Sequence, residues 1–381
     1  MASVYLHIPF CQSRCIYCDF YSTTSLAKQQ RYVDCLIREM QLRQAEWPLR
    51  AQTLSIYIGG GTPSTLPPTL LQEIFRRVTS LYPPTADAEI TLEANPDDVT
   101  AEWIVALKQT PVNRISMGVQ TFHDPLLHTL RRRHSSQQAR QAVRMLQEAG
   151  YDNLSIDLIY GLPGQTMEMW QSDVEQAIQL GTPHLSAYSL MFEEGTPLTR
   201  MLEAGLVQEM SDDLSWQCYE YLCQRLEAAG YQHYEISNFA LPGKHSRHNS
   251  AYWTGAPYLG FGAGAHSYDG QRTRRSNKDS LDEYLRCLST GNGKGSDTYY
   301  ELEELSDTDL YNEFVMTRLR TSQGFCLDEL EQRFGKEALA DCQEALHQHL
   351  VQGNITKEGQ QIRLTRQGVF VSNDVISDLF Q

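Results

Sequence analysis

Three cysteines lie close together near the start of the chain. Residues 11–18 read CQSRCIYC, which places Cys11, Cys15 and Cys18 on one short stretch. Thiolate is a soft ligand that suits iron–sulfur clusters, zinc or Cu(I). This stretch is therefore a candidate metal site.

The number of cysteines favours one kind of metal site over the others. A [4Fe–4S] cube needs one protein ligand for each of its irons to be closed, so three cysteines leave one iron open to a small molecule. A structural zinc site would need a fourth ligand nearby, and such sites usually carry their cysteines in separated pairs. We interpret the triplet as the ligand set of an open iron–sulfur cluster, with zinc or free thiols as the alternatives.

Further candidates are glycines and polar residues at the ends of apolar segments. Gly59 to Pro63 follow the apolar run 53–58, and glycines let a backbone take positive φ and approach a ligand closely. Glu93, Gln120 and Asp157 lie in or at the end of later apolar runs. A carboxylate is expensive to bury alone, so these residues either have structural partners or face a ligand. Their recurrence in successive segments favours the ligand, whereas the glycine run by itself could be a tight turn.

Alternating strands and helices must position these residues. Apolar, β-branched runs predict strands, and apolar residues at helical spacing predict helices. The predicted strands are 3–8, 53–58, 89–94, 114–119, 153–160 and 184–191, and the predicted helices are 31–45, 67–81, 100–109, 135–149 and 167–180. Such a series gives a parallel sheet whose functional groups collect at the carboxyl ends of its strands. Six βα units are too few to close an eight-stranded barrel, so we expect an α/β fold with an open, partial (β/α)6 TIM-like barrel.

The last part of the chain has a different character. The segment GNGKGS (291–296) indicates a flexible joint, and the helical and two-stranded patterns that follow predict a small winged-helix-like domain. We predict three regions: a barrel core at 1–235, a linker or extension at 236–296, and the C-terminal domain at 297–381. The acidic residues of this tail favour covering the barrel or binding a partner over reading a DNA groove.

Composition sets limits on the class of protein. The 381 residues are enough for one large domain with one or two small ones, and a net charge of −15 argues against nucleic acid as the main partner. Nine cysteines, an odd number with six scattered outside the triplet, argue against a secreted disulfide framework. No apolar run approaches the roughly 20 residues of a membrane span, and the N-terminus lacks the plan of a signal peptide. We therefore expect a soluble, cytoplasmic protein.

The C-x3-C-x2-C spacing, with Tyr17 before the last cysteine, resembles the signature of radical S-adenosylmethionine (SAM) enzymes. In that superfamily SAM chelates the open iron of a [4Fe–4S] cluster and is cleaved to a radical. The motifs YLHIPFC, GGGTPS, LEANP, RISMGVQ and IDLIYGLPGQT further resemble the oxygen-independent coproporphyrinogen III oxidase family, in the same order along the first half of the chain.

That resemblance implies the partial barrel, a [4Fe–4S] cluster on the three cysteines, SAM as a second cofactor and a C-terminal extension of the type found in the family. The SAM-contacting positions of the family match Tyr5, Gly60, Gly61, Thr62, Glu93, Gln120, Arg132 and Asp157.

The chain departs from the decarboxylating oxidases of this family in two places. Those enzymes carry a fourth cysteine shortly after the triplet, where this chain has Phe20. They also have a substantial segment before the motif, whereas ten residues precede Cys11 here. Both departures favour a sister group whose members are heme chaperones.

Residues 247–253, RHNSAYW, resemble the HNxxYW haem-binding motif of that sister group. The match implies haem contacts by His248, Asn249, Tyr252 and Trp253. Neutral imidazole is a common ligand of haem iron, and tyrosine and tryptophan offer apolar faces with a polar edge. The alternative is a loop histidine beside ordinary core aromatics.

The sequence thus predicts a heme chaperone that carries a SAM-binding [4Fe–4S] cluster and transfers haem to respiratory haemoproteins. A homodimer that depends on the cluster, and peripheral contact with a membrane, are both compatible with this hypothesis. We expect no coproporphyrinogen III dehydrogenase activity. That activity, which decarboxylates two propionates to vinyl groups, is one alternative, and a radical SAM enzyme with an unrelated substrate is another.

Overall fold

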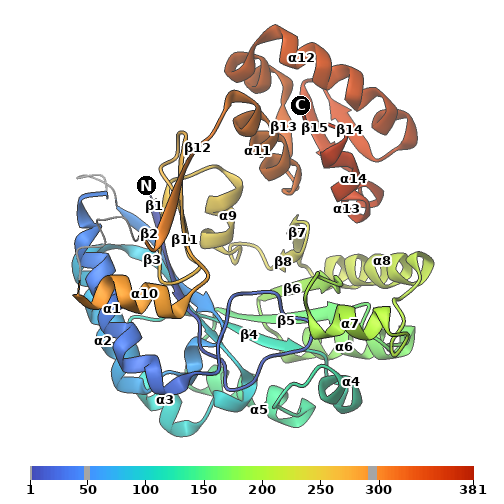
Figure 1. Ribbon diagram of the computed structural model, residues 1–381. Coiled ribbons are helices and arrows are strands. Elements are labelled where there is room, and N and C mark those ends of the chain that lie inside the picture. Colours follow the sequence, from blue (N-terminus) through green and yellow to red (C-terminus); the bar gives the residue numbers. More distant parts are fainter. Residues whose placement is uncertain (1, 47–51, 291–297) are drawn as a thin grey trace.

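A computed structural model of the protein describes residues 2–46, 52–290 and 298–381 (Figure 1). Its main feature is a 12-stranded sheet with the order β12-β11-β10-β9-β1-β2-β3-β4-β5-β6-β8-β7. The parallel centre consists of β1 (Ala2–Ile8), β2 (Thr53–Gly60), β3 (Pro84–Ala94), β4 (Arg114–Gln120), β5 (Leu154–Tyr160) and β6 (His184–Ser189). The predicted six strands are confirmed, and in the described part of the chain β12 and β7 remain as open edges.

Helices connect these strands and cover one face of the sheet (Figure 1). They are α1 (Gln29–Leu42), α2 (Pro68–Leu81), α3 (Ala101–Leu107), α4 (Asp124–Thr129), α5 (Ser136–Glu148) and α6 (Met167–Leu180), with short turns η1 (Leu26–Lys28), η2 (Gln44–Glu46), η3 (Pro63–Thr65) and η4 (Pro96–Asp98). The α/β class and the partial (β/α)6 barrel are as predicted.

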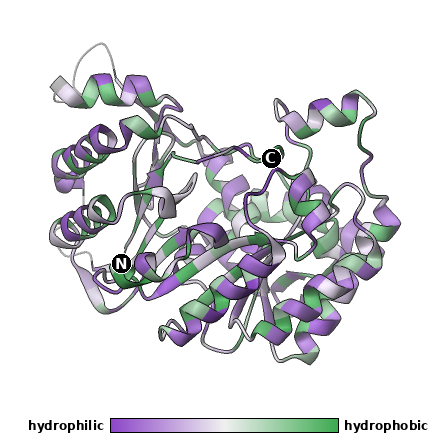
Figure 2. Cartoon of the chain, turned by 90° about the horizontal axis from the view of Figure 1, so that it is seen from below, coloured by the Kyte–Doolittle hydropathy of each residue, from purple (hydrophilic) through white to green (hydrophobic). Residues whose placement is uncertain are grey.

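Amphipathic sequences explain why these helices form and which face they bury. Helix α5 begins with a capping box, in which Ser135 and Gln138 each bond the other's backbone. Its buried residues recur at helical spacing, with Ala139, Val143 and Leu146 against the sheet. Figure 2 shows helices with both polar and apolar residues along their length, as this pattern requires.

Both edges of the sheet carry strands that the sequence analysis did not predict. Beside β1 lie β9 (Tyr258–Phe261), which is parallel to it, and then the antiparallel β10 (His266–Tyr268), β11 (Thr273–Asn277) and β12 (Tyr300–Glu304). Beside β6 lies the hairpin of β7 (Gln232–Glu235) and β8 (Asn238–Ala240). The helices of this region are α7 (Pro197–Glu203), α8 (Asp212–Ala228), α9 (Arg247–Trp253) and α10 (Leu281–Thr290).

The C-terminal unit has its own apolar core and a three-stranded sheet. It comprises α11 (Asp307–Leu319), β13 (Phe325–Cys326), α12 (Leu327–Gln352), β14 (Ile355–Glu358), β15 (Gln361–Leu364), α13 (Arg366–Phe370) and α14 (Ser372–Ser377). Phe370 packs edge-on against Trp216 of α8, with ring centroids 5.3 Å apart, which joins this unit to the barrel. The predicted joint at 291–296 lies outside the described residues, and the three-region division stays a proposal.

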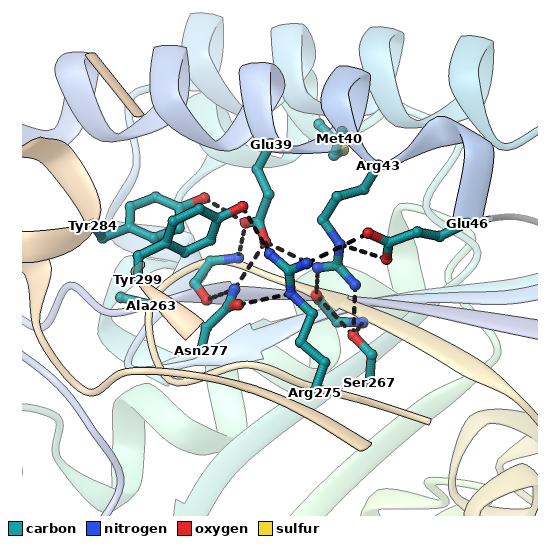
Figure 3. A network of polar contacts seen from close by, with 12 residues as sticks. Glu39, Met40, Arg43, Glu46, Ala263, Ser267, Arg275, Asn277, Tyr284 and Tyr299 are labelled. Atoms are coloured by element: carbon teal, nitrogen blue, oxygen red, sulfur yellow. Dashed lines mark hydrogen bonds and ion pairs between the residues drawn. The ribbon is translucent and has the colours of Figure 1, made fainter. Parts of the chain in front are cut away.

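A buried ion-pair network fastens α1 to the strands beside β1 (Figure 3). The carboxylate of Glu39, which is 0% exposed, accepts hydrogen bonds from Arg43 Nη1 at 2.9 Å and from the Tyr284 hydroxyl at 2.6 Å. It also accepts from Asn277 Nδ2 and from the Gly262 amide, both at 2.8 Å. One carboxylate therefore joins α1, α10, β11 and the turn after β9.

Replacing Glu39 with alanine is expected to lower the free energy of unfolding by about 3–5 kcal/mol, because Arg43 would lose its fully buried partner and keep only the more exposed Glu46, and the other donors to Glu39 would lose their acceptor. Urea unfolding followed by circular dichroism measures this change. The control is Glu73→Ala, which breaks exposed ion pairs to Arg76 and Arg77 and should cost less than about 1 kcal/mol. Equal losses in the two variants would contradict a structural role for the network.

Candidate cofactor-binding site

A cavity of about 690 Å³ extends from the carboxyl ends of the parallel strands into the barrel. Its volume lies within the range of about 300–1,000 Å³ that is usual for small-molecule sites. All three cysteines of the triplet and all but one of the residues expected to contact SAM line it, namely Cys11, Cys15, Cys18, Gly60, Gly61, Thr62, Glu93, Gln120, Arg132 and Asp157. The exception is Tyr5, whose hydroxyl is hydrogen-bonded to His7 Nδ1 at 3.0 Å.

Backbone hydrogen bonds fix the base of the cysteine loop. The amide of Cys11 donates to Thr23 O at 2.9 Å, and the amide of Gly61 donates to Ile8 O at 2.8 Å. The middle of the loop is held by Ile16, a buried side chain in a small apolar cluster that includes residues of α4, β5 and α7. The loop is therefore anchored at both its base and its centre.

A chain of polar contacts links the thiols to the strand ends. Thr62 Oγ1 lies 3.5 Å from Cys11 Sγ and accepts a hydrogen bond from Asn95 Nδ2 at 3.3 Å. Arg132 Nη2 donates to Asn95 Oδ1 at 2.7 Å, while Arg132 Nη1 lies 3.2 Å from Cys15 Sγ. Asn95 was not among the predicted site residues, although it belongs to the LEANP motif that was noticed for Glu93.

The donor set suits a cluster better than a single ion. Among the residues that the structure describes, no three Cys, His, Asp or Glu side chains converge to hold one metal ion. A [4Fe–4S] cube binds each thiolate through a different iron, so its ligands need not converge on one point. Burial raises the pKa of Cys18 to about 11, so its thiol is protonated at neutral pH and would release that proton to a bound metal.

Close packing explains the glycine motif at the end of β2. A Cβ atom on Gly61 would lie 2.9 Å from Phe10 O and 3.0 Å from Cys11 Sγ. Gly60 has φ +111°, and a Cβ there would meet the His7 ring at 2.6 Å. The glycines are thus required by the neighbouring cysteine loop and strand β1, in addition to any approach of a ligand.

Two half-buried carboxyl groups face the cavity. Burial raises the pKa of Glu93 to about 7 and that of Asp157 to about 6. Glu93 accepts hydrogen bonds from the Tyr57 hydroxyl at 2.6 Å and from the Gly60 amide at 3.1 Å. Such raised values are typical of groups placed to meet a ligand, here one with a cationic or hydrogen-bond-donating part.

Gln120 stands in a strained backbone conformation at the end of β4. Its φ of 71° is in the left-handed region that non-glycine residues seldom adopt. The pairing of β4 with β5 shifts register at the same place, between Gly118 and Gln120. Strain of this kind persists where surrounding structure holds it and concentrates at functional sites, which agrees with the amide facing the cavity.

The raised pKa of Glu93 predicts a pH dependence of folding. The folded chain keeps this proton up to about pH 7, whereas the unfolded chain releases it near the ordinary value of 4.5. The folded state therefore binds more protons in this interval, so Glu93 makes stability fall as pH rises through it. We expect Glu93→Gln to gain a few degrees in unfolding midpoint relative to wild-type apoprotein between about pH 5 and pH 8.

Glu73→Gln is the matched control for this measurement. The hydrogen bond from Arg76 lowers the pKa of Glu73, so its contribution is present above the unfolded pKa and is lost as pH falls. Because this loss lies below the ordinary value of 4.5, the difference in unfolding midpoint between Glu73→Gln and wild type should stay constant between about pH 5 and pH 8. A difference for Glu93→Gln that does not vary with pH would show that its carboxyl is ionised normally in the fold.

The HNxxYW motif forms helix α9, which lies over β1 and β2 and beside α11 (Figure 1). Ser246 caps this helix by accepting from the Asn249 amide at 3.2 Å. The buried carboxylate of Glu89 on β3 accepts from the Arg247 and His248 amides at 3.0 and 3.1 Å. The start of α9 is thus fixed to the inner face of the barrel.

The four motif residues do not all reach the cavity. Asn249 lines it, but His248 is 2% exposed and both its ring nitrogens have partners. Nδ1 lies 2.9 Å from Ser55 Oγ and Nε2 lies 3.1 Å from the Tyr252 hydroxyl. Burial lowers the pKa of His248 to about 3, so the imidazole is neutral, as an iron ligand must be. In this conformation, however, no nitrogen of the ring is open to a ligand.

Large apolar side chains surround the mouth of the cavity. Phe20, Met191 and Tyr188 line it and are 65%, 61% and 43% exposed. Exposed apolar groups that lie together mark binding surfaces more often than scattered ones do. The mouth therefore suits a molecule with a large apolar face.

A cysteine loop of this spacing at the carboxyl edge of an open (β/α)6 barrel defines a radical SAM protein. The family model described as Radical SAM superfamily matches residues 5–177, and the one described as HemN C-terminal domain matches residues 305–371. Among solved structures, coproporphyrinogen III oxidase (HemN) from Escherichia coli, a radical SAM enzyme, has a TM-score of 0.84 over 100% of this chain and 90% of its own. Its sequence identity is 22%, so this likeness concerns the fold alone.

Similar proteins of known name show to which family of radical SAM proteins the chain belongs. Heme chaperone HemW of Lactococcus lactis subsp. lactis is 37% identical over 374 residues, which covers 98% of this chain and 96% of the relative. Heme chaperone HemW of Bacillus subtilis is 34% identical and covers 98% of both chains. The protein of the same name from Escherichia coli is 37% identical, with 84% of this chain and 82% of the relative covered. The chain belongs to the HemW family.

Proposed function

We propose that the protein is a heme chaperone, which binds haem and transfers it to respiratory haemoproteins. The observation that carries this proposal is the similarity, over nearly the whole chain, to proteins named heme chaperone HemW. The exposed apolar mouth of the cavity supports it, because a flat macrocycle needs such surfaces. Phe20, in the position of the oxidases' fourth cysteine, favours the chaperone over a decarboxylating enzyme.

We also propose the cofactors. Cys11, Cys15 and Cys18 would hold a [4Fe–4S] cluster, and SAM would lie against the glycines after β2 with Glu93, Gln120, Arg132 and Asp157 around it. When bound, the cluster would supply an electron to SAM. The chain's own part is to position both: Arg132 orients Cys15 and Asn95, and the hydrogen bonds from Tyr57 and Gly60 orient the Glu93 carboxyl.

Haem binding through His248 would require a local rearrangement. Nε2 would have to exchange the Tyr252 hydroxyl for iron. Because His248 and Tyr252 both lie on α9, this exchange requires the Tyr252 side chain to rotate away. The neutral ring, held at Nδ1 by Ser55, is otherwise suited to this role. Tyr252 would then compete with the iron for the same nitrogen.

A haem titration of reconstituted protein, followed by the Soret band, tests this function. Wild type should bind haem, and His248→Ala should bind at least about tenfold more weakly with an altered spectrum, because an iron ligand is lost. Tyr252→Phe should bind up to about fivefold more tightly, since it removes a competing hydrogen bond of about 1 kcal/mol. If His248 has only a structural role, Tyr252→Phe should bind haem no more tightly than wild type. Absence of haem binding by wild type would remove the proposal.

The proposal also covers the proteins that accept haem, the location in the cell and the oligomeric state. Among the described residues no helix is long and apolar enough to cross a bilayer. We infer that the protein acts in the cytoplasm, contacts membrane haemoproteins from there, and forms a cluster-dependent homodimer. Size-exclusion chromatography of apoprotein and of cluster-loaded protein distinguishes this dimer from a constitutive monomer.

A further inference from the structure

Two arginines on the cavity wall lack hydrogen-bond acceptors among the residues that the structure describes. Arg114, the first residue of β4, is 2% exposed, and in the described part of the chain its guanidinium has no hydrogen bond or ion pair. Arg320, just after α11, is half-buried and lines the same cavity, and among the described residues its buried Nε has no partner. A buried guanidinium without acceptors is strongly unfavourable, so native proteins almost always supply one.

Arg320 is held at the cavity by well-defined contacts. Its carbonyl accepts a hydrogen bond at 2.9 Å from the amide of Ile236, which also lines the cavity. Its guanidinium carbon lies 4.9 Å from the centre of the Trp253 ring, a cation–π distance. The Trp253 Nε1 is itself buried without an acceptor. The last residue of the HNxxYW motif thus supports a cation contributed by the C-terminal unit.

The nearby acids act on these cations only from a distance. The charge of Arg114 opposes the rise in pKa of Glu93 and Asp157, and that of Arg320 opposes the rise in pKa of Glu235. Among the residues described, however, none of these carboxyl groups forms a hydrogen bond or a close ion pair with either arginine, and Glu93 is hydrogen-bonded to Tyr57 and Gly60 instead. Arg132 differs from both arginines, because it already donates to Asn95 and to Gly118 O. Arg114 and Arg320 are therefore cations whose acceptors are expected to come with a ligand.

We propose that Arg114 and Arg320 bind the carboxylate groups of the molecule that occupies this cavity, which on the proposed function are the propionates of haem. The guanidinium group matches a carboxylate with two parallel hydrogen bonds, and this geometry is selective as well as strong. The inference rests on the proposed function for the identity of the ligand. It assigns the specificity for a dicarboxylic porphyrin to two residues outside the HNxxYW motif and outside the cysteine loop.

Titrations with haem and with haem dimethyl ester, in the same detergent-containing buffer, test this assignment. The ester keeps the iron and the macrocycle but has no carboxylates. Wild type should bind haem about tenfold or more tightly than the ester, because charge-assisted hydrogen bonds are lost in the ester. Arg114→Gln and Arg320→Gln should each reduce this ratio severalfold. Arg76→Gln, which changes an exposed arginine on α2, should keep the wild-type ratio.

Stability and SAM binding provide independent readouts. Arg114→Gln removes an unpaired buried charge, so the apoprotein should unfold at the same or a higher temperature than wild type. Arg114→Lys, which keeps the charge without the planar fork, should also lose part of the preference for haem. SAM affinity should be unchanged in these variants; a large loss of SAM affinity with an intact haem-to-ester ratio would reassign Arg114 to SAM.

The remaining outcomes separate this inference from the proposed function. If neither haem nor its ester binds to wild type, both are overturned. If both bind equally well, or if both arginine variants keep the full preference for haem, the carboxylate subsite is wrong while the chaperone function stands.

Discussion

Replacing Cys15 with alanine should reduce the cluster content of anaerobically reconstituted protein to background. Three protein ligands already leave one iron open, so a second open iron would expose the cube to loss of iron. Cys15 also accepts a contact from Arg132 Nη1 at 3.2 Å, and this guanidinium connects the cysteine to the strand ends. Iron and sulfide per chain, together with the absorbance of the cluster, measure the effect.

Cys326→Ala is the matched control, because Cys326 is a partly exposed thiol in the C-terminal unit, far along the chain from the triplet. It should retain wild-type iron and sulfide. Cys11→Ala and Cys18→Ala should behave like Cys15→Ala. Wild-type cluster content in any of these triplet variants would mean that the cluster is held elsewhere, and the SAM site built around the loop would have to be abandoned.

The parallel strands could be predicted because their signals are local. The runs that became β1, β2, β4 and β5 are apolar, β-branched and separated by helical segments, and the structure places them as expected. Strand β9 has only four residues, and it pairs with β1 from more than 200 positions away. Its register depends on long-range packing, such as the network around Glu39, which a local pattern does not encode.

In the candidate site, too, residues in local motifs could be predicted, whereas residues placed by long-range packing could not. The cysteines, the glycines and the strand-end carboxyl groups lie in contiguous motifs, and they line one cavity because parallel strands end at one edge. In the sequence, Arg114 looks like an ordinary residue at the start of a strand. Arg320 reaches the cavity only because the C-terminal unit packs beside β7 and β8. The depth of His248 is likewise a tertiary effect, since a motif of polar and aromatic residues does not reveal how far it is buried.

Incubation of the reconstituted protein with coproporphyrinogen III, SAM and a reductant should give no protoporphyrinogen IX. The oxidases place a fourth cysteine where this chain has Phe20, a side chain that is 65% exposed at the cavity mouth. A phenyl ring offers no thiol for ligation or for hydrogen transfer. Coproporphyrinogen III oxidase from Escherichia coli, assayed in parallel, shows that substrate, SAM and electrons are all competent.

Product analysis and the haem titration together distinguish the three functions that the sequence left open. Divinyl porphyrin product without haem affinity would establish the dehydrogenase, whereas haem affinity without product supports the chaperone. If the protein gives neither the product nor haem binding, it is a radical SAM enzyme that acts on another substrate.

The variant Phe20→Cys tests the role of this position directly. Because Phe20 is exposed and packs little, the variant should fold and keep its cluster. Product from this variant alone would show that one side chain at the mouth separates the chaperone from the oxidase, while its continued absence would mean that the rest of the cavity, including the arginines on its wall, is built to hold a porphyrin without decarboxylating it.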